Sequence, residues 1–223
     1  MNHRQWLDNQ YQQWVAALKE CTVDNFKEHP MVRRMLSLDM DGKEHLKYSI
    51  SISEEEYANM RAIDFLGTKH KFPTHVSGAC NRMIYYAQKV LAANPSHICE
   101  IGGGVGQFYA VLRALGYKGK YWIYDIPEVK DFQYQYLEEV MKRTNLRLWQ
   151  DMQGKFDYCV SFYALGEFDD ETKQQYIDNV VKQCPHGLVL WNPHSGASDQ
   201  ITWDCKIEDE NPLTSPGNKM LTW

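Results

Sequence analysis

The chain has 223 residues, of which 43% are hydrophobic, and it carries a formal net charge of −5 at pH 7. This length suits one domain with a sizeable core, and the mild acidity does not favour nucleic acid or an anionic membrane as a partner. No apolar run approaches the roughly 18 residues of a membrane-spanning helix, and the first residues lack the apolar core of a signal peptide. The six cysteines have no metal-like spacing, so we expect reduced thiols and a cytoplasmic location.

The first 95 residues are predicted to be mainly helical. Apolar periodicity predicts a helix over 2–20 and a second helical piece over 26–36, with Pro30 at its start or at a break. Ser53 and Glu56 have the spacing of a capping box, which predicts a helix from there to Gly67. A further helix is expected over 77–92. Tyr85 and Tyr86 lie in it, either as core residues or facing a ligand.

From residue 97 onward, strands and helices alternate. Continuous apolar runs predict strands at 97–102, 120–125, 146–150, 156–163 and 187–192. Helices are expected between them at 105–115, 127–143 and 170–184. Such runs fit strands buried on both faces of a parallel sheet. We therefore predict an α/β, doubly wound, mostly parallel sheet over 96–223, closed by a β-hairpin after residue 200, with residues 1–95 as a helical N-terminal cap.

The stretch 98–107 (ICEIGGGVGQ) joins a predicted strand to a predicted helix through four glycines. A dinucleotide fingerprint would need a third glycine at the position of Gln107, and a phosphate loop would need a lysine after Gly106; neither is present. The pattern is instead an acid, Glu100, followed by glycines at every second position. Glycines let the backbone pass close beneath a ligand, where a Cβ would clash. Without a ligand, the same pattern would be only a tight turn.

A second acid, Asp125, ends the next predicted strand about twenty residues later. In a doubly wound sheet an acid at this place accepts hydrogen bonds from ribose hydroxyls. Residues 148–152 (LWQDM) follow a further short strand, and Asp151 or one of its neighbours there is expected to border the base of a nucleotide-like ligand.

These residues resemble the class I, Rossmann-like methyltransferases that use S-adenosylmethionine. The resemblance rests on Glu100–Gly106 and on 124–128 (YDIPE). It implies a seven-stranded sheet and S-adenosylmethionine as the cofactor. The candidate cofactor-binding residues are Glu100, Gly102, Gly103, Gly104, Gly106, Gln107, Asp125, Ile126, Asp151 and Ser161. Glu100 would either orient the turn or meet the cationic methionine part of the cofactor.

Two later segments, 161–167 (SFYALGE) and 212–223 (PLTSPGNKMLTW), resemble the sugar O-methyltransferases. This resemblance implies methyl transfer to a hydroxyl of a small acceptor, a sugar or nucleotide sugar. The alternatives are a methyltransferase for another small molecule, a protein or a nucleic acid, and a non-catalytic module that keeps the fold. The net acidity argues against nucleic acid.

Methylation of a hydroxyl needs a base to take its proton. His194 is the first candidate, because imidazole titrates near neutral pH, and Glu167 is the second. The alternatives are a histidine that caps a turn and a glutamate that caps the helix beginning near Asp170. Together with Asp169 and Asp170 these two could hold Mg²⁺, but we predict no metal site and do not favour a metal requirement.

Overall fold

The computed structural model describes residues 3–36, 48–69, 75–192 and 201–223. The helices are α1 (His3–Glu20), η1 (Phe26–Glu28), α2 (Pro30–Met35), α3 (Glu54–Asp64), α4 (Gly78–Ala92), α5 (Gln107–Ala114), α6 (Pro127–Arg143), α7 (Ala164–Glu167), α8 (Asp170–Asn179) and η3 (Val181–Gln183). The strands are β1 (His97–Ile101), β2 (Lys120–Tyr124), β3 (Tyr158–Phe162), β4 (His186–Trp191), β5 (Lys206–Asp209) and β6 (Lys219–Thr222).

The six strands form one sheet in the order β2-β1-β3-β4-β6-β5. The first four are parallel, and β6 runs antiparallel to both β4 and β5. The order of β1 and β2 reverses with respect to β3, which makes the sheet doubly wound and places a switch point at the end of β1. The predicted α/β class and the closing hairpin are confirmed.

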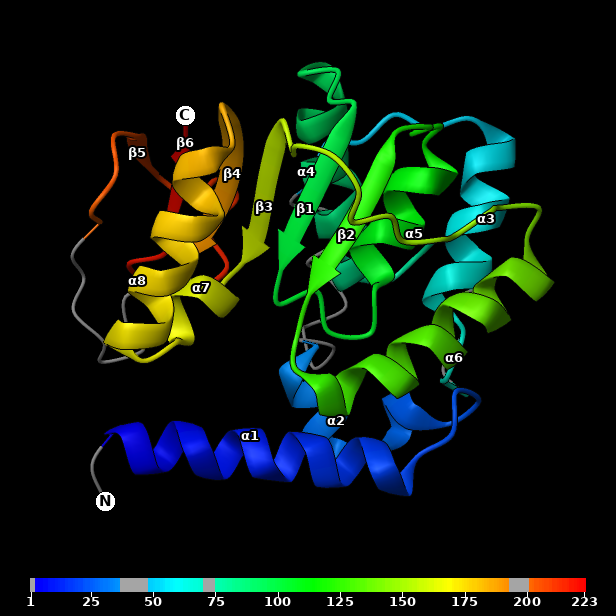
Figure 1. The fold of residues 1–223 in the computed structure, drawn as a ribbon. Coiled ribbons are helices and arrows are strands. Elements are labelled where there is room, and N and C mark those ends of the chain that lie inside the picture. Colours follow the sequence, from blue (N-terminus) through cyan, green and yellow to red (C-terminus); the bar gives the residue numbers. More distant parts are fainter. Residues whose placement is uncertain (1–2, 37–47, 70–74, 193–200) are drawn as a thin grey trace.

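Each face of the sheet buries its own hydrophobic cluster, because alternate side chains of each strand point to opposite faces. Cys99, Ile101, Val189 and Trp191 face the cluster under α8 and η3. Ile98, Val160, Leu188 and Leu190 face the larger cluster, to which α1, α3, α4, α5 and α6 contribute. In Figure 1 the arrowheads of the parallel strands point toward α1, which lies across that edge of the sheet with α2 and the start of α6.

The N-terminal helices begin where the local sequence supplies caps. The Ser53 hydroxyl accepts from the Glu56 backbone N–H, while the Glu56 carboxylate accepts from the Ser53 backbone N–H, so the predicted capping box is present. Pro30 occupies the first turn of α2, and the His29 ring accepts from the Met31 N–H. Proline is tolerated there because the N–H it lacks would have no helical partner.

The strand predicted at 146–150 is wrong: these residues form no strand. Ile123 of β2 donates to the Gln150 side-chain Oε1 (2.9 Å), where a strand would offer a backbone carbonyl. The Asp151 N–H donates to the Tyr121 carbonyl (2.9 Å). A side chain therefore takes up part of the edge of β2, and the described residues form six strands rather than seven.

No helix in the described ranges has both the length and the apolar character needed to cross a membrane. The helix predicted at 170–184 is divided at Val180 into α8 and η3. The helix predicted at 127–143 matches α6.

Candidate functional site

The turn between β1 and α5 depends on its glycines. Gly102, Gly104 and Gly106 have φ values of 72°, 55° and 86°, a left-handed region that other residues rarely adopt. A Cβ on Gly102 would lie 2.2 Å from the Ala164 Cβ, and one on Gly103 would lie 2.6 Å from Ile123. At Gly104, by contrast, a Cβ would meet no atom of the described residues within 4 Å. In the part of the chain that the structure describes, the turn is thus packed from below and open above Gly104.

Asp125 closes the turn from the side of β2. Its Oδ2 accepts from the Gly104 N–H (2.7 Å), and its Oδ1 accepts from the Ile126 N–H (2.8 Å) at the start of α6. Burial raises the pKa of Asp125 to about 6, although these two backbone hydrogen bonds oppose the shift. The structure thus brings Asp125 and Ile126 together with the glycine turn, as predicted.

Glu100 lies beneath the turn. It is 2% exposed, and it accepts a hydrogen bond from the Tyr121 hydroxyl (2.8 Å). A Cβ on Gly103 would lie 2.7 Å from its Oε2, so this carboxyl group supports the turn directly. Burial raises the pKa of Glu100 to about 8. This geometry fits an orienting role better than direct contact with a cation above the turn.

A chain of buried amides holds the other side of Gly104. Gln133 of α6 donates to the Gly104 carbonyl (2.7 Å) and accepts from the Gln150 side-chain amide (2.8 Å). The side-chain oxygen of Gln150 in turn accepts from the Ile123 backbone N–H. Gln107, at the first position of α5, is 2% exposed, and neither its Nε2 nor its Oε1 has a hydrogen-bond partner among the described residues. A buried amide without a partner is costly, so Gln107 is suited to a polar ligand at the turn. Gln133 was not identified from the sequence.

Two of the predicted cofactor-binding residues, Ser161 and Asp151, are engaged with other parts of the chain. Ser161 is fully buried, and its hydroxyl donates to the Ile101 carbonyl (3.0 Å) and accepts from the Leu165 N–H (3.2 Å), so it ties β1 and β3 to α7. Asp151 forms an ion pair with Lys120 (3.0 Å), and its carbonyl lies 3.0 Å from the His97 ring. Lys120 and His97 begin β2 and β1, so Asp151 sits at the edge of the sheet opposite the glycine turn, and the structure does not bring it to the site.

Glu167 ends α7, which follows β3 at the same edge of the sheet as the glycine turn. It has no hydrogen bond or ion pair with any described residue, and burial raises its pKa. It does not cap α8, because Asp169 does so by accepting from the Thr172 N–H (2.9 Å). Glu167 is thus a largely buried carboxyl group without a cap function. His194 lies outside the described residues.

The described residues contain no group of three or more His, Cys, Asp or Glu side chains placed to hold a metal ion. Asp169 is engaged as the cap of α8, and Asp170 lies 3.6 Å from the Lys173 ammonium.

A buried carboxylate that the sequence did not reveal, Glu210, ties the β5–β6 loop to the end of β3. Its Oε1 accepts from the Tyr163 hydroxyl (2.5 Å) and from the Tyr86 hydroxyl (3.4 Å), and its Oε2 accepts from Thr214 and from the Asn218 amide (3.1 Å). Tyr163 has a φ of 68° although it is not glycine. Such strained residues cluster at functional sites, and Tyr163 directly precedes α7.

Tyr11 connects α1 to the same edge. Its hydroxyl donates to Glu128 (3.2 Å) in the first turn of α6. Burial, together with Glu128 and Asp125, raises the pKa of Tyr11 to about 12, so it remains a donor. Trp14, by contrast, is a core residue with 6% exposure.

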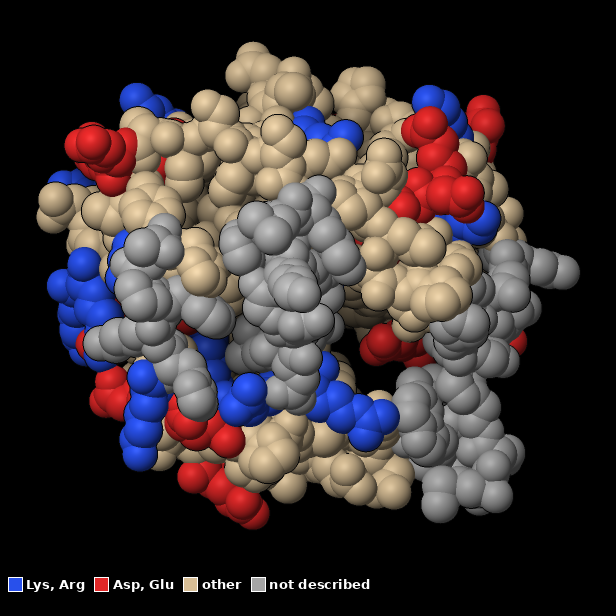
Figure 2. Space-filling model, turned by 180° about the vertical axis from the view of Figure 1, so that it is seen from behind, with Lys and Arg blue, Asp and Glu red and all other residues tan. Residues whose placement is uncertain are grey.

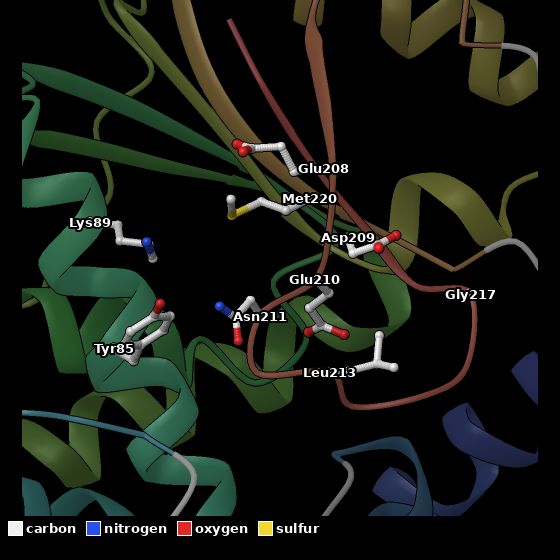
Figure 3. Close-up of a pocket in the computed structure, with 9 residues that line it drawn as sticks. All are labelled: Tyr85, Lys89, Glu208, Asp209, Glu210, Asn211, Leu213, Gly217 and Met220. Atoms are coloured by element: carbon white, nitrogen blue, oxygen red, sulfur yellow. The ribbon is translucent and has the colours of Figure 1, made fainter.

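A cavity of about 750 Å³ lies between α4 and the β5–β6 hairpin. Figure 3 shows Tyr85 and Lys89 on α4 facing Asn211 and Met220 across it, with Glu210 beside them. Glu210 and Asn211 follow the end of β5, and Asp209 is paired with Lys219, which is itself paired with the end of β4. The cavity therefore opens at the same edge of the sheet as the glycine turn. On the face seen in Figure 2, basic and acidic side chains are interspersed.

The family model described as a methyltransferase domain matches residues 56–190. No curated protein matches the chain. Among solved structures, it is similar to a candidate O-methyltransferase from Nostoc punctiforme PCC 73102 (12% identity, TM-score 0.46, 64% of this chain and 55% of that chain). It is also similar to an O-methyltransferase family protein from Burkholderia thailandensis (12% identity, TM-score 0.42, 63% of this chain and 56% of that chain). A third is magnesium protoporphyrin IX methyltransferase from Synechocystis PCC 6803 with bound S-adenosylhomocysteine (13% identity, TM-score 0.43, 76% and 94%). The chain thus spans just over half the length of the first two.

Proposed function

The chain belongs to the methyltransferase domain family, and from that premise we propose that it methylates a hydroxyl of a small acceptor, a sugar or nucleotide sugar. The enzyme is an S-adenosylmethionine-dependent methyltransferase. The observation that carries the proposal is the turn of Gly102–Gly106, which is packed below, clamped by Asp125 and open above Gly104.

The residues of the turn fit S-adenosylmethionine on two counts. The space above Gly104 is one that a Cβ would fill, and the buried Gln107 amide has no hydrogen-bond partner in the described part of the chain. Asp125 uses one lone pair of each oxygen on the backbone, so both oxygens can still accept from ribose hydroxyls. In the proposed cofactor site, Glu100 and Ser161 support the turn. Asp151 is not part of this site.

S-adenosylmethionine bound there supplies an electrophilic methyl group on a sulfonium. We assign the general base to Glu167, whose carboxyl group lies at the strand edge, has no hydrogen bond or ion pair with a described residue and has a raised pKa. A raised pKa makes the carboxylate a better proton acceptor once it is ionised. The hydroxyl proton passes to this carboxylate as the oxygen gains the methyl group. His194 is the other candidate base.

The acceptor and the division of the chain are part of the same proposal. Residues 161–167 and 212–223 support a sugar acceptor through their resemblance to sugar O-methyltransferases. Residues 1–95 would form the acceptor side and residues 96–223 the cofactor side. The described cysteines are free thiols, which supports a cytoplasmic location.

Calorimetry with S-adenosylhomocysteine tests the part of the proposal that concerns cofactor binding, through two matched substitutions. Gly104→Ala and Gly116→Ala place a methyl group at left-handed positions (φ 55° and 89°), and no described residue lies within 4 Å of either Cβ. Each should cost about 1–2 kcal/mol of stability. Only Gly104→Ala should weaken binding, by about tenfold or more, because its methyl group enters the ligand space.

Equal binding by the two variants, or no binding by the wild type, would contradict the cofactor site. The acceptor half is tested by incubating the wild type with cofactor labelled in its methyl group and a panel of sugars and nucleotide sugars. Label found only in protein or nucleic acid would reject the sugar acceptor, and cofactor binding without transfer to any acceptor would favour a non-catalytic module.

A further inference from the structure

We propose that the cavity between α4 and the β5–β6 hairpin binds the body of the acceptor, and that it selects an uncharged, polyhydroxylated ring over one that carries phosphate. This inference rests on the proposed function and narrows its acceptor. It starts from the chemistry of the lining, which combines one aromatic ring and two apolar side chains with an amide, a lysine and three carboxylates.

The carboxylates of the lining are already neutralised or engaged. Glu208 forms an ion pair with Lys206 (2.9 Å), and Asp209 forms one with Lys219 (2.6 Å). Glu210 is buried and accepts from Tyr163, Tyr86, Thr214 and Asn218. These acids therefore do not form a free anionic site for an amine.

The hydrogen-bonding groups that remain are few and mostly neutral. Tyr85 presents a ring and a phenol, and Asn211 presents an amide; neither polar group has a hydrogen bond with another described residue. In Figure 3 the Asn211 amide points across the cavity toward Tyr85. The Lys89 ammonium lies 4.8 Å from the centre of the Tyr85 ring. The Tyr85 phenol, the Asn211 amide and the Lys89 ammonium are hydrogen-bonding groups that match the hydroxyls of a sugar ring.

The charge balance gives a phosphate no advantage in the same place. The lining has three carboxylates and Lys89, and two of these carboxylates are paired with Lys206 and Lys219. The three acids and three lysines cancel, so the cavity has no net positive charge to attract a phosphate group. A neutral ring needs no such charge, which favours the free sugar or its neutral glycoside over the nucleotide sugar.

Contacts around Tyr163 link the cavity to the proposed cofactor turn. Glu210 in the lining holds the Tyr163 hydroxyl, and the next residue, Ala164, lies where a Cβ on Gly102 would be. The acceptor body in the cavity and the cofactor above the turn would therefore flank the same corner of the chain, from which α7 carries Glu167.

The experiment uses the full chain with saturating S-adenosylhomocysteine and saturation-transfer NMR with four probes: methyl glucoside, glucose, UDP-glucose and spermidine. The glycoside or glucose should give a signal that Asn211→Ala and Lys89→Ala weaken by about tenfold. Asn145→Ala and Lys118→Ala serve as matched controls, since both positions are exposed and have no side-chain hydrogen bond or ion pair with another described residue. All five proteins should bind S-adenosylhomocysteine equally.

Preferred binding of UDP-glucose or spermidine would overturn the proposal. It would also be overturned if the cavity variants matched their controls, or if no probe bound to protein that binds S-adenosylhomocysteine. Failure of the wild type to bind S-adenosylhomocysteine would instead count against the proposed function, so the two failures are distinguishable.

Discussion

Glu100 is the acid that begins the glycine motif, yet in the folded chain it lies under the turn rather than on it. Its pKa of about 8 means that it is mainly protonated at neutral pH, because burial disfavours the charged form. A neutral carboxyl group can support the turn and accept from Tyr121, but it cannot attract a cation by charge. We therefore interpret its place in the motif as structural.

Substituting Glu100 by glutamine should change how stability depends on pH. The folded pKa is about 8, against an ordinary value of 4.5. The contribution of Glu100 to stability is thus fully present below about pH 4.5 and is lost as pH rises through 8. Glu100→Gln lacks this loss, so its free energy of unfolding should exceed that of the wild type by a few kcal/mol at pH 8 but not at pH 5.

Urea unfolding at pH 5 and pH 8 measures this difference. Glu171→Gln, at an exposed position of α8, is the control and should follow the wild type at both pH values. If the curves of wild type and Glu100→Gln stayed parallel, the buried carboxyl group would have an ordinary pKa, and the interpretation would be wrong.

The short helix α7 determines where the proposed base lies. It is only four residues long, begins after the strained Tyr163 and packs against β4 as well as β3. Strain at its start is balanced by the Tyr163 hydroxyl bonds to Glu210 and Thr214. Glu167 is consequently carried on a rigid corner rather than on a free loop.

Replacing Glu167 by glutamine should lower kcat by about 10²- to 10⁴-fold, the range of general-base catalysis. Binding of S-adenosylhomocysteine should be unchanged, because Glu167 takes no part in the hydrogen bonds that Asp125 and Gln133 form with the glycine turn. In the wild type, kcat should rise with pH, because the base must be ionised. The midpoint should lie above the ordinary glutamate value of 4.5, since burial raises this pKa. Measuring kcat as a function of pH, with the acceptor identified by the labelling assay, tests both effects. Glu171→Gln is the control. An unchanged kcat in Glu167→Gln would show that Glu167 is not the general base.

Across the chain, sequence patterns correctly predicted the elements that depend on residues close together in the sequence. The capping box at Ser53, the helix at 127–143 and the apolar strands of the sheet are confirmed. The strand at 146–150 failed because the side chain of Gln150 takes up part of the edge of β2, and that error also misplaced Asp151. The contacts of Glu210 with Tyr86 and Tyr163 span 124 and 47 residues, so no sequence pattern could reveal them.

The position of α1 could not be predicted either. Its apolar residues indicate that one face of the helix is buried, but not which part of the molecule that face packs against. In the fold it lies across the edge that holds the glycine turn, and it contacts α2 and α6. The Tyr11 hydroxyl bond to Glu128 joins α1 to α6 within reach of Asp125. This arrangement suggests that α1 slows the release of a ligand bound above the turn.

Tyr11→Phe should therefore speed dissociation of S-adenosylhomocysteine several-fold while lowering stability by no more than about 1 kcal/mol, the net value of one hydrogen bond. The helix itself stays anchored, since Trp14, Val15, Ala17 and Leu18 are buried in the core. Stopped-flow dissociation measures the rate, and Gln13→Ala, an exposed position on the same helix whose side chain bonds only to Asn9 among the described residues, is the control. If both variants release the ligand at the wild-type rate, α1 is a structural cover without influence on exchange. Faster release in Tyr11→Phe alone would mean that the N-terminal helix, through one phenol, takes part in holding the cofactor.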